Sequence, residues 1–588
     1  MPSFSLALVL LLSLSSSCSN QEERSLLQFL AGLSQNGGLA ASWRNGTDCC
    51  RWEGITCNAN REVTEVSLAS IGLEGHVSPS IGSLKGMLRL NLSGNSLSGG
   101  LPLEVMFSNT MVSLDVSFNR LSGDLLELPS STPGRPLQVL NISSNFFTGS
   151  FPSATWEKTR NLVALNASNN SSTGRMPSSF CISSPPLAVL DLSYNRFSGP
   201  IPPDLGNCFA LRVLKAGYNK ITGTLPDELF DATSLEYLSL SNNGLGGTLY
   251  AAHIYKLSNL VFLDLAMTGL GGKIPDSIGQ LKKLEELHLE HNNMTRELPT
   301  SLSKCTSLTT ISLRRNNFQG ELTKINFSTL SNLKILDLYG NNFTVVKENR
   351  NLKSLTFLSL THNNFTNITN TLHILKSSRN LQALLIGVNF KHEVMAQDET
   401  MDGFENLQVL GEIPAALMEL PMMQSEKTQA YLDINYFEVP IYLSSAYQYR
   451  SINALPQELA SLIKDNLHSK HLILSTEESL IAVLQQLRCG NDDDDGDREE
   501  DDDEADTIEL QPAGAYHRLL LHRLAEIYGF AHESVGEGED RHLVLQRCPE
   551  TAIPPVLVSD MLWKFDNSDD FASVVLTRND TESSNPPI

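Results

Sequence analysis

A repeat of about 24 residues runs through most of this chain and constrains its fold more than any other sequence feature. Each unit follows the pattern LxxLxLSxNxLxGxIPxxLxxLxx, as in residues 187–210 and 211–234. One unit cannot bury its own leucines, so successive units must stack and share a continuous core. The units open at Met87, Met111, Leu137, Leu162, Leu187, Leu211, Leu235, Leu260, Leu284, Leu308, Leu333, Leu355, Leu381 and Leu407. We therefore predict a solenoid with one short strand per unit and parallel strands on its concave face.

Asparagine recurs at the ninth position of the unit. It stands at Asn145, Asn170, Asn195, Asn219, Asn243, Asn292, Asn316, Asn341, Asn363 and Asn389. A side-chain amide there can satisfy backbone groups of neighbouring turns that would otherwise be buried unpaired. Thr268 interrupts this ladder, and the units opening at Leu333 and Leu381 lack the GxIP return. The leucines and ladder asparagines are expected to be scaffold, and the pattern is identified as an α/β leucine-rich-repeat solenoid.

The repeat breaks in mid-unit between Leu410 and Gly411. The last unit opens as LQVL and continues directly as GEIP, so the LSxNxLx stretch that belongs between them is absent. Residues 457–588 then carry 10 Lys and Arg against 29 Asp and Glu, which accounts for −19 of the net charge of −23. Residues 492–506 are mostly acidic, and such a block repels itself. The sequence therefore indicates two unlike parts joined through a disordered acidic linker.

The first 20 residues form an apolar run that ends in small residues, which predicts a signal peptide or a signal anchor. Cys50 and Cys57 closely flank RWEGIT just before the first repeat, and we expect a disulfide that caps the open solenoid end. Cys49 is left without an assigned partner. Three further cysteines in repeat loops are expected to be buried apolar fillers, namely Cys181, Cys208 and Cys305. Eleven N-x-S/T sites precede residue 400, about the number that an Asn- and Ser-rich repeat yields by chance.

The segment DCCRWEGITC followed by these repeats resembles the ectodomain of plant receptor-like kinases and receptor-like proteins. The Tyr-rich stretch 428–457 lacks the repeat period and resembles the island of phytosulfokine and tyrosine-sulfated-glycopeptide receptors. That resemblance implies a secreted, possibly tyrosine-sulfated, peptide or a co-receptor as partner, and an extracellular or plasma-membrane location. It also implies further repeats, a transmembrane helix and a kinase, none of which the sequence contains.

Side chains between the strand leucines should point from the concave face. Near the island, Arg314 is the cation among these positions, and a sulfate would favour one. Arg314 and Tyr339 are therefore the candidate peptide-binding residues, with a solvated surface charge as the alternative interpretation of Arg314. No nucleophile, base and orienting acid line up, so the first half is interpreted as a binding module rather than an enzyme.

Residues 515–549 predict a helix ending at Gly529, a turn over 532–541 and a strand over 542–547. The buried helix face is expected to consist of Leu519, Leu520, Leu524 and Ile527. Arg518 and His522 stand four residues apart and project from one helix face, with Arg541 before the strand. This order of residues resembles the R-three-H domain, named for Arg and His separated by three residues.

The R-three-H resemblance implies binding of single-stranded DNA or RNA through Arg518, His522 and Arg541. An Arg can pair with phosphate or stack on a base, and an imidazole can donate or stack. The alternative is that Arg518 and His522 serve only the local fold. No cysteine or carboxylate completes a ligand set around the histidines, so neither a metal site nor a cofactor is predicted.

The sequence thus predicts a non-enzymatic protein that joins a receptor-like recognition module to a nucleic-acid-binding domain. Alternatively, it is primarily a DNA- or RNA-binding protein, of the cytoplasm or nucleus, whose receptor part reflects a gene-fusion or gene-model artefact. The expected divisions are 1–20, signal peptide or anchor; 21–62, N-terminal cap; 63–410, repeats; 411–456, truncated repeat and island-like segment; 457–490, helical segment; 491–511, acidic linker; 512–565, R-three-H domain; and 566–588, disordered tail.

Overall fold

The computed structural model describes two units of the chain, which are considered separately. They divide at Asn435 and Tyr436. The described residues are 18–127, 134–152, 159–177, 181, 184–249, 253–345, 353–387, 389–390, 393, 406–407, 409–411, 473, 476, 480, 507–510, 521–522, 524–525, 527–536, 542–547 and 551. Of the expected truncated repeat and island-like segment at 411–456, only Gly411 is among them, and the acidic run at 492–506 lies outside them.

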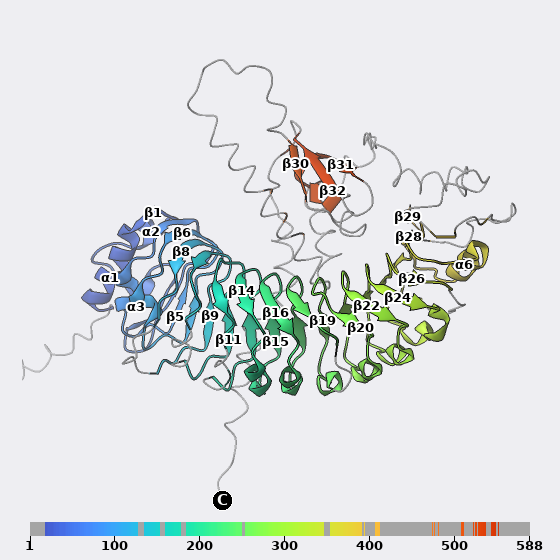
Figure 1. The fold of residues 1–588 in the computed structure, drawn as a ribbon. Coiled ribbons are helices and arrows are strands. Elements are labelled where there is room, and N and C mark those ends of the chain that lie inside the picture. The colour runs from blue at the N-terminus through green and yellow to red at the C-terminus, as the bar shows by residue number, and fades with distance from the viewer. Residues whose placement is uncertain are drawn as a thin grey trace, which may run out of the picture. The chain divides into compact units, whose positions relative to one another are not determined.

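The first unit is a solenoid whose strands stack side by side (Figure 1). Among the described residues its main sheet has 16 strands, which pair in parallel apart from β2 with β3. They are β2 Ile55–Cys57, β3 Val63–Ser67, β5 Arg89–Asn91, β7 Ser113–Asp115, β9 Val139–Asn141, β11 Ala164–Asn166, β13 Val189–Asp191, β15 Val213–Lys215, β17 Tyr237–Ser239, β19 Phe262–Asp264, β21 Glu286–His288, β23 Thr310–Ser312, β25 Ile335–Asp337, β27 Phe357–Ser359, β28 Ala383–Leu385 and β29 Val409–Gly411. The predicted parallel solenoid is confirmed.

Further short strands, most of which follow the turns at the ladder position, form additional sheets on the side of the stack, which the repeat pattern did not predict. They are β1 Leu33–Asn36, β4 Leu73–His76, β6 Ser96–Gly99, β8 Arg120–Asp124, β10 Phe146–Thr148, β12 Thr173–Arg175, β14 Arg196–Gly199, β16 Lys220–Thr224, β18 Gly244–Gly246, β20 Gly271–Gly272, β22 Asn293–Arg296, β24 Asn317–Gly320 and β26 Asn342–Phe343. Each repeat thus adds one strand to the main sheet and, in most cases, a second to the side.

The return of most repeats is a short helical turn (Figure 1). The α-helices of this unit with printed bounds are α1 Asn20–Ala31, α2 Leu39–Ser42, α3 Leu103–Met106 and α6 Ile368–Leu375. The 3-10 turns are η1 Cys49–Arg51, η2 Pro79–Ser83, η3 Pro203–Asn207, η4 Asp227–Asp231, η5 Ile254–Lys256, η6 Asp276–Gln280, η7 Thr300–Lys304, η8 Leu322–Lys324 and η9 Phe327–Thr329. Leucines from strands and returns fill one continuous core, as stacking of incomplete units requires.

The asparagine ladder joins each repeat to its neighbours by hydrogen bonds. In one rung, Nδ2 of Asn195 donates to the carbonyl of Ala167 in the preceding repeat at 2.9 Å. Its Oδ1 accepts from the Ser172 N–H, also at 2.9 Å. At the interruption, the Thr268 hydroxyl lies 2.8 Å from the Leu265 carbonyl of its own repeat and 3.0 Å from Oδ1 of Asn292 in the next, and it can donate its one proton to either. Thr268 therefore forms no counterpart of the bond from Asn195 to the preceding repeat among the described residues.

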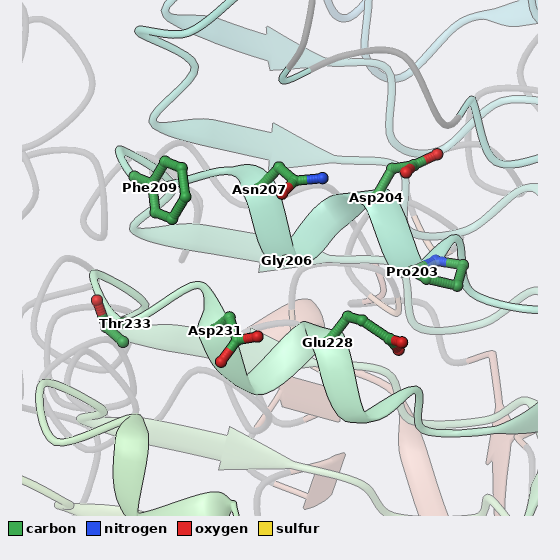
Figure 2. A pocket seen from close by; sticks show the side chains of 8 residues that line it. All are labelled: Pro203, Asp204, Gly206, Asn207, Phe209, Glu228, Asp231 and Thr233. Atoms are coloured by element: carbon green, nitrogen blue, oxygen red, sulfur yellow. The ribbon is translucent and has the colours of Figure 1, made fainter.

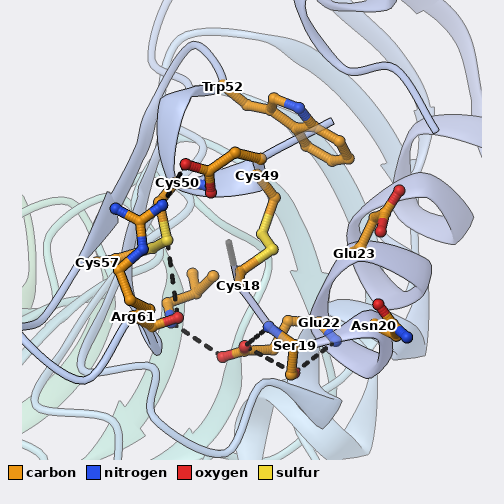
Figure 3. The surroundings of a disulfide bond; sticks show 12 residues. Cys18, Ser19, Asn20, Glu22, Glu23, Cys49, Cys50, Trp52, Cys57 and Arg61 are labelled. Atoms are coloured by element: carbon orange, nitrogen blue, oxygen red, sulfur yellow. Dashed lines mark hydrogen bonds and ion pairs between the residues drawn. A yellow bond between two sulfur atoms is a disulfide. The ribbon is translucent and has the colours of Figure 1, made fainter. Parts of the chain in front are cut away.

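Helix α1 covers the N-terminal end of the core (Figure 3). Its capping box pairs the Ser19 hydroxyl with the Glu22 N–H, and the Glu22 carboxylate with the Ser19 N–H. The other oxygen of Glu22 accepts from the Val63 N–H at 2.9 Å, which ties the helix to the first parallel strand. Satisfying these terminal groups lets a helix close an end that would otherwise expose leucines.

The cysteine pattern differs from the sequence expectation. Cys50 is bonded to Cys57, the pair that the spacing predicts, but Cys49 is bonded to Cys18 rather than lacking a partner (Figure 3). Cys181 and Cys208 form a third disulfide, so the expectation of two apolar fillers is wrong. These two stand in consecutive repeats, 27 residues apart, and stacking brings their Cα atoms within 4.9 Å. Cys305 is a buried free thiol.

The second unit contains a three-stranded antiparallel sheet in the order β30–β32–β31. The strands are β30 Thr507–Glu509, β31 Ala531–Val535 and β32 His542–Gln546. The strand expected over 542–547 is thus present, whereas residues expected in a turn and in the linker form β31 and β30. Residues 521–522, 524–525 and 527–528 are helical, and Gly529 ends the helix with positive φ. The Phe530 N–H donates to the Ala525 carbonyl, which is a Schellman bond.

Burial in the second unit agrees only partly with the expected helix face. Leu524 is buried and Ile527 is half-buried, while Leu519 and Leu520 lie outside the described residues. The buried set instead includes Leu521, Tyr528, Phe530, Leu543 and Leu545. The small sheet and the helix therefore share a core of their own.

Candidate functional site

Strand register sets the candidate site on the concave face of the solenoid. Asp264, His288, Ser312 and Asp337 are paired across β19, β21, β23 and β25, so they form one row. Adjacent parallel strands lie about 4.8 Å apart, and side chains two positions along a strand share a face. Polar side chains of successive repeats are therefore neighbours in space, although they stand about one repeat apart in the sequence.

His288 lies between two carboxylates in this row. Its Nε2 is 3.0 Å from Oε2 of Glu286, and its Nδ1 is 3.8 Å from Oε1 of Glu290. Its side chain is 5% exposed. Burial by itself would lower the pKa of His288, but hydrogen bonds and charge from Glu286 and Glu290 outweigh it and raise the pKa well above its usual value. The site therefore holds a cationic imidazole at neutral pH.

Arg314 and Tyr339, the two predicted peptide-binding residues, are brought together. The guanidinium carbon of Arg314 lies 4.4 Å from the centre of the Tyr339 ring, a cation–π contact. The His362 ring meets the same Tyr339 ring edge-on at 5.1 Å. Burial raises the pKa of Asp337, and the charge of Arg314 opposes that rise. Arg314 is thus held against an aromatic ring and near a carboxyl group rather than being a freely solvated charge.

Aromatic and hydroxyl groups continue the row toward the N-terminus. The rings of Tyr194 and Tyr218 stack at 4.2 Å, and burial raises the pKa of both hydroxyls. The carboxylate of Asp264 accepts from the hydroxyls of Ser239 at 2.8 Å and Ser241 at 2.6 Å. Stacked tyrosines and a hydroxyl-bonded carboxylate thus accompany the charged residues of this part of the solenoid.

Apart from the concave face, the structure has a pocket between the turns η3 and η4 (Figure 2). Its volume is about 610 Å³, and its lining includes Asp204, Glu228, Asp231 and the exposed ring of Phe209. One of these carboxylates is neutralised, because Nζ of Lys256 lies 2.6 Å from Asp231.

In the second unit, His522 is fixed by two residues of β31. Its Nδ1 is 2.8 Å from Nδ1 of His532, and its Nε2 is 3.1 Å from the hydroxyl of Ser534. The first contact needs one ring to donate and the other to accept, so the two rings cannot both be fully protonated while it persists. Arg518 and Arg541 lie outside the described residues.

Sequence reasoning missed His532 as a partner of His522. The stretch after the helix reads as a turn because Gly, Glu and Asp follow it closely. The available signal was alternation: His532 and Ser534 stand two apart, and residues at that spacing share one face of a strand.

Four family descriptions match this chain. "Leucine rich repeat N-terminal domain" matches residues 19–58, "Leucine-rich repeat region" matches 170–446, and "Leucine Rich Repeat" matches 136–157. The R-three-H domain matches residues 498–547. The fold and these matches define a leucine-rich-repeat protein with an N-terminal cap and a C-terminal R-three-H domain. Both are binding modules, and neither is a kinase.

The repeats are similar to those of plant receptors. Phytosulfokine receptor 1 of Arabidopsis thaliana is 30% identical over 162 residues, which cover 24% of this chain and 16% of that receptor. Receptor-like protein 3 of the same plant is 39% identical over 87 residues, 14% of this chain and 11% of that protein. The chain thus matches only a small share of each relative.

Two solved structures of plant receptors have the same fold as the first unit. PEPR1–AtPEP1 superimposes with a TM-score of 0.54 at 28% identity, over 63% of this chain and 55% of that one. The plant peptide hormone receptor RGFR1, in complex with RGF2, also has a TM-score of 0.54 at 26% identity, over 62% and 58%. The first unit therefore has the architecture of a plant leucine-rich-repeat receptor ectodomain. Among the described residues, we find no helix with the length and apolarity needed to span a bilayer.

Proposed function

We propose that the first unit is an extracellular recognition module that binds an extended peptide along the concave face from β19 to β25. The contact between Arg314 and Tyr339, beside the row containing His288, is the observation that carries this proposal. An extended peptide advances about 3.3 Å per residue, so a short segment spans several strands of the sheet. Arg314 would pair with an anionic group of the peptide, and Tyr339 would hold the guanidinium in place.

The similarity to the plant peptide hormone receptor RGFR1 in complex with RGF2 supports peptide binding by this unit. More specifically, we propose that the peptide carries a sulfate group or that a co-receptor binds beside it. The break between Leu410 and Gly411 falls inside β29, which still pairs with β28 in register. If the island and the later repeats together form the site, the loss of repeats on either side of the island displaces part of it and weakens binding. We expect a Kd no tighter than micromolar.

Calorimetry tests this proposal. The full chain is titrated with a synthetic tyrosine-sulfated peptide and with its unsulfated form. Arg314→Ala should abolish the heat of binding, while Arg196→Ala, an exposed arginine on the side strand β14, should leave it unchanged. Submicromolar affinity would contradict the expected weakness. Equal binding by Arg314→Ala would remove Arg314 from the site.

A second function is proposed for the R-three-H unit, namely binding of single-stranded DNA or RNA. The support is the fixed position of His522 against β31, together with Arg518 and Arg541 in the order that the domain family shows. Phosphate and stacking contacts carry little base information, so binding should depend weakly on sequence. This unit could equally be the main function of the chain, as the alternative interpretation holds.

Fluorescence anisotropy of a labelled single-stranded oligonucleotide tests the second function. The double variant Arg518→Ala with His522→Ala should lose binding to all sequences about equally. Arg523→Ala is the matched control, because it removes one arginine of the same stretch that does not belong to the Arg-and-His pair. Unchanged affinity in the double variant would show that this pair serves only the fold.

A further inference from the structure

A row of four exposed asparagines runs along the side of the solenoid, one in each successive repeat. Asn293, Asn317 and Asn342 open β22, β24 and β26, and Asn364 follows in the next repeat. These strands pair in parallel, with Asn317 opposite Thr295 and Asn342 opposite Gln319. Their side chains form two bonded pairs. Nδ2 of Asn317 donates to Oδ1 of Asn293 at 2.7 Å, and Nδ2 of Asn364 donates to Oδ1 of Asn342 at 3.3 Å.

The two acceptors of these pairs share a sequence feature. Asn293 stands in NMT and Asn342 in NFT, so both fit the N-x-S/T rule for N-linked glycans. The Nδ2 atoms of both make no hydrogen bond to the residues that the structure describes, and that nitrogen is where a sugar attaches. Of the two donors, Asn317 stands in NFQ, and Asn364 stands in NFT but commits its Nδ2 to Asn342.

We propose that Asn293 and Asn342 carry N-linked oligosaccharides. In the transfer, Nδ2 bonds to C1 of an oligosaccharide carried on a lipid pyrophosphate. The bond between C1 and the pyrophosphate oxygen breaks, the lipid pyrophosphate leaves with its electron pair, and the amide loses one proton. The substituted amide keeps its carbonyl oxygen. The bonds from Asn317 to Asn293 and from Asn364 to Asn342 therefore persist.

The N-x-S/T site at Asn170 is engaged differently in the fold. Nδ2 of the ladder residue Asn170 donates to the carbonyls of Ile142, Ala167 and Ser168 at 3.0, 3.3 and 3.1 Å. A sugar on Asn170 would displace bonds that hold consecutive repeats together, so the folded protein cannot accept one there. The structure therefore distinguishes Asn293 and Asn342 from Asn170, although all three fit the same sequence rule.

Two glycans at these positions would stand two repeats apart, about 10 Å along the stack. They would cover the side of β22, β24 and β26 with sugar. The concave row with His288 lies on a different surface of the same repeats and would stay open. A protein partner of this part of the solenoid would thus be directed away from the asparagine row.

The test separates this site assignment from the secretory location, on which it rests. The full chain is expressed in plant cells with its own N-terminus, and in parallel with residues 1–17 replaced by an established secretion leader. The secreted protein is treated with a peptide N-glycosidase in ¹⁸O water and mapped by mass spectrometry. We expect label at Asn293 and Asn342 and none at Asn170. Asn293→Gln and Asn342→Gln should each remove the mass of one glycan, while Asn317→Gln should remove none.

The outcomes distinguish the two ideas. Label at these sites only with the added leader would overturn secretion by the native N-terminus but would uphold the sites. A folded protein secreted with the added leader but lacking label at Asn293 and Asn342 would overturn the sites. Label at Asn170 in folded protein would do the same. Thermal unfolding of each variant verifies folding, since all three substituted side chains are exposed.

Discussion

At the scale of single residues, Thr268 offers a place where the scaffold can be improved. Asparagines at the other ladder positions reach the preceding repeat. For example, Asn243 accepts from the Ile221 N–H and donates to the Ala216 carbonyl. By the same spacing, an asparagine at 268 would accept from Leu245 and donate to Leu240. Thr268→Asn should therefore stabilise the solenoid by about 1 kcal/mol, the net value of a buried hydrogen bond.

Chemical denaturation of the first unit measures the effect of Thr268→Asn. The matched change is Asn243→Thr, which should destabilise by about 1–3 kcal/mol because it leaves buried backbone groups without partners. If both substitutions were neutral, the ladder would contribute nothing to stability at these repeats.

His288 should make the stability of the solenoid depend on pH. Its pKa is raised in the folded state, so its stabilising contribution is complete below the unfolded value of about 6.5. That contribution is lost as pH rises through the folded-state pKa, because the imidazole loses its charge between Glu286 and Glu290. The thermal midpoint of unfolding should accordingly decrease as the pH is raised from 6 into the alkaline range. His288→Gln should flatten this part of the profile, and an unchanged slope would contradict the role of His288.

At the scale of elements, the Cys181–Cys208 disulfide joins two consecutive returns. A cross-link that closes a loop of this length restricts the unfolded chain by about 3–4 kcal/mol in the chain-entropy model. Replacing both cysteines by serine should lower the free energy of unfolding by up to that amount. Guanidinium unfolding checks this, with Cys305→Ser as the single-thiol control. Equal stability of the double variant and the wild type would show that the bond constrains nothing.

The elements also show how far sequence reasoning reaches. The main strands and the asparagine ladder follow from a 24-residue period, because each unit can bury its leucines only by stacking. The side strands do not follow, because the one periodic apolar residue in each, such as Leu97 or Phe197, does not by itself distinguish a strand from a turn. Helix α6 does not follow, because its repeat lacks the GxIP return. To predict the Cys181–Cys208 bond, one would need to know that equivalent positions in consecutive returns lie close together in space. The sequence places Arg314 and Tyr339 on the same face of the sheet, but it does not predict that their side chains are in contact.

At the scale of the whole molecule, net charge is concentrated in the C-terminal quarter of the chain. Residues 492–506 place many carboxylates beside the domain proposed to bind nucleic acid, and these should repel phosphates. Deleting 492–506 should therefore strengthen binding of a single-stranded oligonucleotide, most clearly at low salt, where screening is least. Anisotropy at two salt concentrations measures this. A gain of the same size at both salts would point to a cause other than charge.

The bond between Cys18 and Cys49 bears on how the polypeptide matures. A leader peptidase that cut after residue 20 would remove Cys18, together with the Ser19 that caps α1. Cys49 would then emerge as a lone thiol in an oxidising compartment, open to mispairing with Cys50 or Cys57. If a leader is removed, cleavage upstream of Cys18 would preserve this bond, and the end of the leader would then lie at least three residues before the expected residue 20.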